Sequence, residues 1–127
     1  MTRGLLDTSV VIAESVESLP DEAAISVITL AELHFGVHMA RDADSRKLRI
    51  RRLSEIESRF DALPVDEAVA RTYGTLAHAV ASSGRSPRSR AMDVLIAATA
   101  QVHDAILFTR NERDFQPFAD MIEIRRV

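Results

Sequence analysis

The 127-residue chain contains no cysteine and only one lysine, Lys47. The absence of cysteine excludes disulfide bonds, thiolate nucleophiles and thiolate metal sites, and it is compatible with a reducing compartment. No apolar run approaches the roughly 18 residues that a membrane span needs. Charged residues interrupt the first seven positions too early for a signal peptide. We therefore expect a cytoplasmic location.

The scarcity of lysine also argues against two enzyme classes that place an aspartate at the end of their first strand. A response-regulator receiver domain needs a lysine at a late strand end. A dehalogenase-type phosphatase needs a lysine and an Asp-x-Asp motif. Here Lys47 lies in the basic segment 46–52, and Ser9 stands where a second aspartate would follow Asp7. Both classes are disfavoured.

The net charge is slightly negative, but the charges are unevenly spread along the chain. The net charge of −3 argues against a generally basic nucleic-acid-binding protein. Residues 68–92 nevertheless contain no acid, and a turn-like segment around Gly84 and Pro87 carries Arg85, Arg88 and Arg90. Any contact with a polyanion is therefore expected to be local.

The hydrophobic pattern alternates between short strands and amphipathic helices. It predicts strands at 4–7, 24–26, 105–108 and 121–124, and helices at 27–39, 45–60, 66–81 and 93–102. Strands separated by helices pair in parallel and are covered by helices on both faces. We find no repeat and no linker, so residues 1–127 are predicted to form one α/β domain.

Four acidic residues are the most informative feature of the chain. Asp7, Glu32 and Asp93 each interrupt an apolar run, and Asp114 follows the apolar segment 105–108. Carboxylates are rarely buried without a partner. In a parallel sheet, ligands bind beyond the carboxyl ends of the strands, where the three aspartates are expected to converge. A divalent metal is the simplest common partner for them.

Helix phase gives Glu32 a specific direction. At about 100° per residue, it shares a stripe with Ile28, Ala31, Phe35 and Met39. We expect this stripe to face the core.

Each acid also has a simpler interpretation when it is taken alone. Asp7 and Asp93 are well placed to cap helices, Glu32 could pair with an arginine, and Asp114 could be a solvated loop residue. Together, four such positions favour a shared site.

Four motifs in this order resemble PIN-domain ribonucleases, specifically the VapC toxins of type II toxin–antitoxin pairs. They are Leu6-Asp7-Thr8-Ser9, Ala31-Glu32-Leu33 with Gly36, Asp93-Val94-Leu95-Ile96-Ala97-Ala98, and Leu107-Phe108-Thr109-Arg110-Asn111-Glu112-Arg113-Asp114-Phe115. Each motif alone is weak, but the ordered set spans nearly the whole chain. The resemblance implies a three-layer α/β/α PIN-like domain with a short, mostly parallel central sheet.

The resemblance also implies a metal site and its residues. Asp7 and Asp93 would bind Mg²⁺ directly, with Mn²⁺ able to substitute, while Glu32 and Asp114 would act through water. Thr8, Ser9, Thr109 and Asn111 match polar supporting positions. Some relatives carry a further acid at the position of Asn111, so the number of metal ions stays open.

The implied activity is endonucleolytic cleavage of RNA, with tRNA or ribosomal RNA as the usual target class. The implied partners are a second copy of the chain and a VapB-type antitoxin that blocks the acidic pocket. A catalytically weak PIN-like module that only binds RNA or a partner protein is the remaining rival function.

Two further surfaces are candidate contact sites. Arg85, Arg88 and Arg90 could bind the RNA backbone beside Asp93, or they could form a solvated loop. Leu30, Leu33 and Val37 form a second apolar face on the helix that carries Glu32. This face could bind a partner or could pack within the fold.

Overall fold

The chain forms a five-stranded sheet with the order β3-β2-β1-β4-β5, in which every neighbouring pair is parallel. A computed structural model describes residues 3–13 and 19–127, so residues 1–2 and 14–18 of the predicted domain lie outside the described part. The strands are β1 (Arg3–Leu6), β2 (Glu22–Ser26), β3 (Ala62–Leu63), β4 (Ile106–Thr109) and β5 (Ile124–Arg126). The predicted parallel α/β architecture is confirmed.

One predicted strand needs correction, and one strand was not predicted. The last strand was expected at 121–124 but lies at Ile124–Arg126, because Met121 and Ile122 instead bond back to Phe118 in a turn. The two-residue strand β3 was not predicted. It is too short to show an alternating pattern, and its pairing with β2 defines it.

The four predicted helices are all present, with ends shifted by a few residues. They are α2 (Val27–His38), α3 (Ala43–Arg59), α4 (Glu67–Ser82) and α5 (Ala91–Val102). Side chains of Ser26, Asp42 and Asp66 accept backbone N–H bonds at the starts of α2, α3 and α4. Shorter elements are α1 (Thr8–Val11) and the 3₁₀ segments η1 (Arg88–Arg90) and η2 (Glu112–Phe118).

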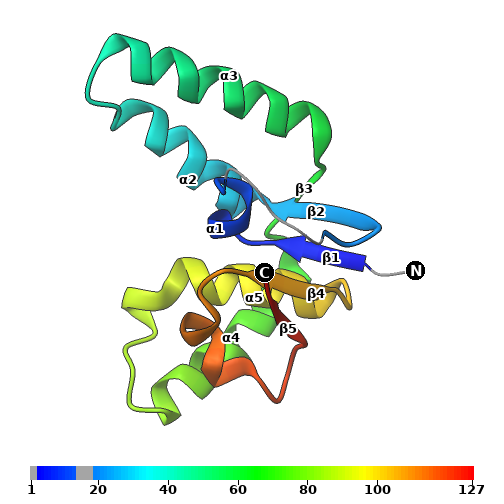
Figure 1. Cartoon of the computed structure of the whole chain (residues 1–127). Coiled ribbons are helices and arrows are strands. Elements are labelled where there is room, and N and C mark those ends of the chain that lie inside the picture. The colour runs from blue at the N-terminus through cyan, green and yellow to red at the C-terminus, as the bar shows by residue number, and fades with distance from the viewer. Residues whose placement is uncertain (1–2, 14–18) are drawn as a thin grey trace.

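Helices cover the sheet on both faces, giving three layers (Figure 1). Neighbouring strand residues alternate between the two cores, as pleating requires. Leu5 and Leu107 pack with α4, α5 and η2, whereas Leu6 and Phe108 pack with α1 and the end of α3. Helices α2 and α3 pack against each other as an antiparallel pair that extends away from the sheet (Figure 1).

The predicted direction of the Glu32 stripe is wrong for most of its length. Phe35 and Met39 are 65% and 61% exposed, and Ala31 is exposed as well. The cause is that α2 runs beyond the sheet and packs against α3, so the inward positions differ from those of a helix lying flat on a sheet. Val37, on the face predicted to bind a partner, is buried, which favours internal packing there.

Among the described residues, no helix combines the length and apolarity that a membrane span requires.

Gly4, in β1, is packed closely against the side-chain rings of Pro20 and Phe108. A Cβ at this position would lie 2.8 Å from Cε1 of Phe108 and closer still to the Pro20 ring. We expect Gly4→Ala to lower the free energy of unfolding by about 1–3 kcal/mol, because a buried ring must move. Thermal or urea unfolding measures the change.

Gly74→Ala is the matched control for this prediction. Gly74 lies inside α4 with open space at its Cβ position, so the substitution should stabilise the helix by up to about 1 kcal/mol. Equal stability of Gly4→Ala and the wild type would contradict the close packing at β1.

Candidate active site

Asp7 follows directly from the carboxyl end of β1 and is only 5% exposed. Its backbone N–H bonds to the Phe108 carbonyl, which continues the β1–β4 pairing. One carboxylate oxygen accepts hydrogen bonds from the Ser9 hydroxyl at 2.5 Å and the Val10 N–H at 3.3 Å. The other accepts from the Thr109 hydroxyl at 2.6 Å. The Asp7 carboxylate is therefore both the cap of α1 and fixed between two strand ends.

The same two hydroxyls also hold the loop after β4. Ser9 Oγ accepts the Arg110 N–H at 3.0 Å, and Thr109 Oγ1 accepts the Asn111 N–H at 2.9 Å. Asn111 thus takes part in this network through its backbone, and its side chain is exposed. The loop is tied to Asp7 by both supporting hydroxyls.

Glu32 lies on α2, whose start is fixed by the Ser26 cap at the end of β2. Its Oε1 accepts a hydrogen bond of 2.6 Å from the Thr8 hydroxyl. The Thr8 hydroxyl is also 3.2 Å from that of Thr29, which is fully buried. The sequence pattern did not single out Thr29, although it lies three residues before Glu32 on the same helix face.

Asp93 is in the first turn of α5, with its side chain 34% exposed. It does not cap the helix: Arg90 holds the N-cap position and no side chain bonds there. Partial burial is the largest cause that raises the pKa of the Asp93 carboxyl to about 6, followed by the negative charges of Asp114, Glu32 and Asp7. All four predicted acids therefore act electrostatically on one region.

Asp114 lies in η2 and pairs with Arg90 at 3.0 Å. The same guanidinium is 4.0 Å from Asp93, and its charge lowers the pKa of that carboxyl. Arg90 is thus a counter-charge within the acidic cluster, and its predicted contact with RNA stays a prediction. Of its two companions, Arg85 donates a hydrogen bond to the Arg113 carbonyl and Arg88 is exposed.

The donors available suit a hard divalent cation. Carboxylate and hydroxyl oxygens line the site, and the raised pKa of Asp93 reflects first its partial burial and then negative charge that Arg90 only partly balances. No three acidic or histidine side chains of the described part of the chain come close enough to coordinate one ion. Mg²⁺ commonly uses one or two protein carboxylates and retains several waters, so it does not need three such side chains close together.

Residues 5–121 match the family model described as PIN domain. This chain is a PIN-domain protein. It is 42% identical to Ribonuclease VapC5 of Mycobacterium tuberculosis over 98% of this chain and 95% of that protein. It is 37% identical to Ribonuclease VapC8 of the same species over 78% of this chain and 91% of that protein. The predicted PIN and VapC resemblance is confirmed.

The fold of this PIN domain is also found in solved structures. A member of the VapBC family of toxin–antitoxin systems, VapBC-5 from Mycobacterium tuberculosis, matches it with a TM-score of 0.85. That match has 36% identity and covers 100% of this chain and 98% of the other. Of the four acids of this PIN domain, Asp7 directly follows β1, while Glu32, Asp93 and Asp114 lie on α2, α5 and η2.

The raised pKa of Asp93 has a consequence for stability. A carboxyl whose pKa is about 6 in the folded protein and 3.8 when unfolded disfavours folding once it ionises. This penalty is absent below pH 3.8 and complete above pH 6. Asp93→Asn should therefore raise stability at pH 7.5 by about 1 kcal/mol after allowance for solvent screening, with no gain near pH 4.

Thermal unfolding with and without Mg²⁺ measures this effect. Added Mg²⁺ should stabilise the wild type more than Asp93→Asn, because the variant lacks the carboxylate that is predicted to bind the ion. Asp120→Asn, at an exposed position, is the control and should behave like the wild type. An equal response of Asp93→Asn and the wild type to pH and to Mg²⁺ would argue against a shared acidic site.

Proposed function

We propose that this PIN domain is a metal-dependent endoribonuclease that acts as the toxin of a VapBC-type pair. The observation that carries the proposal is the Asp7 carboxylate, fixed between β1 and β4 in a region shared with three other acids. The ribonuclease names of its full-length relatives support the reaction class. tRNA or ribosomal RNA remains the target class expected from the resemblance.

In this proposal Asp7 and Asp93 bind Mg²⁺, or Mn²⁺ in its place, while Glu32 and Asp114 act through water. When bound, such an ion lowers the pKa of a coordinated water and neutralises negative charge at the phosphate. The hydrogen bonds from Ser9 and Thr109 fix both oxygens of Asp7. Thr8 occupies Oε1 of Glu32, which leaves Oε2 to accept a proton from the attacking water and to orient it.

Arg90 has a separate part in this mechanism. By pairing with Asp114, it limits the repulsion among the acids before substrate arrives. When RNA binds at the acids, the Arg90 guanidinium would lie close to the phosphate that is cleaved. This role accounts for an arginine inside an acidic cluster.

Asp7→Asn and Asp93→Asn should each reduce RNA cleavage by more than about 100-fold, because loss of a metal ligand removes several kcal/mol of transition-state stabilisation. Cleavage of total RNA by purified protein in Mg²⁺ or Mn²⁺ measures this, with circular dichroism to verify folding. Asp120→Asn should cleave like the wild type.

Two outcomes would count against the proposal. Metal-dependent cleavage retained in both variants would remove Asp7 and Asp93 from the site. Intact RNA binding by the wild type without cleavage in either metal would instead favour an RNA-binding module.

This chain has a groove beside Glu32 that could bind the antitoxin of the proposed pair. A cavity of about 500 Å³ runs between α1, α2 and α3, with Thr8 and Glu32 at its wall. Ile12 and Phe35 also line it and are 54% and 65% exposed, an unusual exposure for large apolar side chains. An apolar segment bound here would cover the approach to the acids. Of the predicted partner face, only Leu33 lines this groove.

Phe35→Asp should weaken binding of a co-expressed VapB-type antitoxin by about 30-fold or more, as expected for loss of a central aromatic anchor. RNA cleavage by the isolated variant should not change. The measurement is the antitoxin concentration that inhibits cleavage by half.

Leu48→Asp is the matched control, because Leu48 is 53% exposed on α3 and does not line the groove. An equal loss of antitoxin affinity in both variants would mean that the antitoxin binds exposed apolar surface in general and not this groove. The homodimer and the cytoplasmic location remain predictions of the same proposal.

A further inference from the structure

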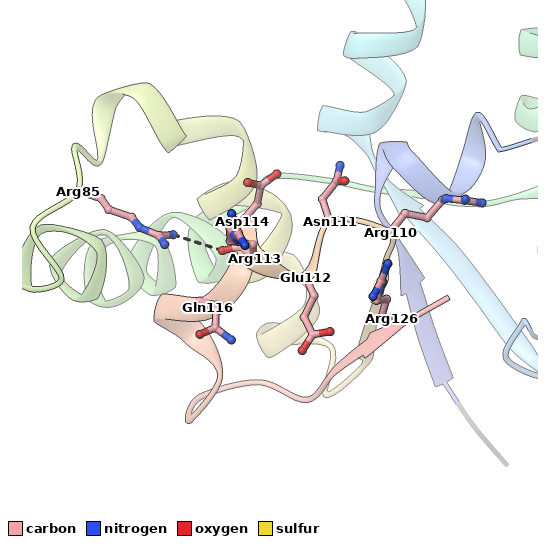
Figure 2. A pocket seen from close by; sticks show the side chains of 8 residues that line it. All are labelled: Arg85, Arg110, Asn111, Glu112, Arg113, Asp114, Gln116 and Arg126. Atoms are coloured by element: carbon pink, nitrogen blue, oxygen red, sulfur yellow. Dashed lines mark hydrogen bonds between the residues drawn. The ribbon is translucent and has the colours of Figure 1, made fainter.

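A second cavity, of about 750 Å³, has Asp114 of the acidic cluster in its lining. Three segments far apart in the sequence form it: the turn after α4, the loop from β4 into η2, and the end of β5 (Figure 2). Its lining residues are Arg85, Arg110, Asn111, Glu112, Arg113, Asp114, Gln116 and Arg126.

Four arginines line this cavity. The side chain of Arg110 extends away from the other three (Figure 2), and we call Arg85, Arg113 and Arg126 the arginine cluster. Figure 2 shows Arg85 and Arg126 on opposite sides, with Arg113 between them. Arg85 is half-buried and donates a 3.3 Å hydrogen bond to the Arg113 carbonyl, which holds its guanidinium at the wall. The turn that carries Arg85 depends on Gly84, whose φ of 84° suits glycine.

The arginine cluster is only partly balanced by acids. Across the described residues, ion pairs involve Arg3, Arg71, Arg90 and Arg125, but no member of the cluster. The cavity contains two acids, Glu112 and Asp114, and Asp114 is already paired with Arg90. Like charges gathered from three segments repel one another, so an anion in the cavity would stabilise the arrangement.

The cavity is continuous with the acidic site. Asp114 lines it and also contributes to the raised pKa of Asp93, and the Asn111 backbone bonds to Thr109, the partner of Asp7. A strand of nucleic acid that ran from the acids into the cavity would thus meet a negative surface and then a positive one. Guanidinium groups bind phosphate oxygens through paired hydrogen bonds.

We propose that the arginine cluster is a subsite for backbone phosphates of single-stranded RNA next to the bond that is cleaved. This inference rests on the proposed ribonuclease function and adds to it the place where the flanking strand binds. Phosphate contacts position the strand without reading its sequence. The loop after β4 connects the two sites, so it sets their distance.

The test is RNA binding by the complete chain carrying Asp7→Asn, which should prevent cleavage. The probe is a fluorescein-labelled single-stranded oligoribonucleotide of mixed sequence, followed by anisotropy at several salt concentrations. Changing all three members of the cluster to glutamine should raise Kd about 10-fold or more. It should also reduce the slope of log Kd against log salt by about 2, since each single-strand phosphate contact contributes roughly 0.7.

A triple control removes the same charge elsewhere. Arg46→Gln, Lys47→Gln and Arg51→Gln lie at exposed positions of α3, and together they should leave Kd and the salt slope nearly unchanged. Since loss of the Arg85 hydrogen bond could disturb the turn, the double variant Arg113→Gln with Arg126→Gln is measured as well. Both of these side chains are exposed, so the double variant should fold normally and show about two-thirds of the loss in salt slope.

In the chain with Asp7 intact, the triple cluster variant should raise KM for the same RNA while kcat stays within about 2-fold, as expected for uniform binding. Unchanged binding in the cluster variants, or an equal loss in the α3 control, would overturn the subsite even if cleavage is normal. If the wild type binds through the cluster but does not cleave, the subsite stands and the ribonuclease proposal fails.

Discussion

The structure depends on one constraint: a parallel sheet brings four carboxylates to the same edge, where their charges must be balanced. Pairing of β1 with β4 places Asp7 beside Thr109, and pairing of β1 with β2 places α2, with Glu32, next to α1. Burial and the other three acids raise the pKa of Asp93, and Arg90 balances part of the charge. A site that concentrates negative charge at an energetic cost is well suited to bind a divalent cation, because the cation removes that cost when it binds.

The sequence predicted the layers and the convergence of the four acids on one region, because both follow from short-range patterns. Alternating apolar runs identify strands and helices locally, and parallel strands share a carboxyl edge whatever their order in the sheet. Asp7 and Asp93 interrupt apolar runs, so their chemistry stands out in the sequence. The predicted supports Ser9 and Thr109 do bond to Asp7, and Thr8 does bond to Glu32.

Other features depend on how helices and strands pack against one another, and local sequence patterns do not show this. The direction of the Glu32 stripe was wrong because α2 packs on α3 and not flat on the sheet, which leaves Phe35 and Met39 exposed. Arg90 looked like part of a basic turn, yet its guanidinium pairs with Asp114, while Arg85 lines the cavity of the arginine cluster. Arg113 and Arg126 were not identified, since they join Arg85 only through the placement of η2 and β5. Thr29 was overlooked because a threonine in a helix has no distinctive pattern.

The central claim is that Asp7 and Asp93 together bind one catalytic metal ion. The most direct measurement is an anomalous difference map from a crystal of the chain soaked in Mn²⁺. The account predicts a peak within coordination distance of both carboxylates, about 2.0–2.3 Å, that disappears in Asp7→Asn crystals. A peak away from both residues, or one that persists in Asp7→Asn, would contradict it.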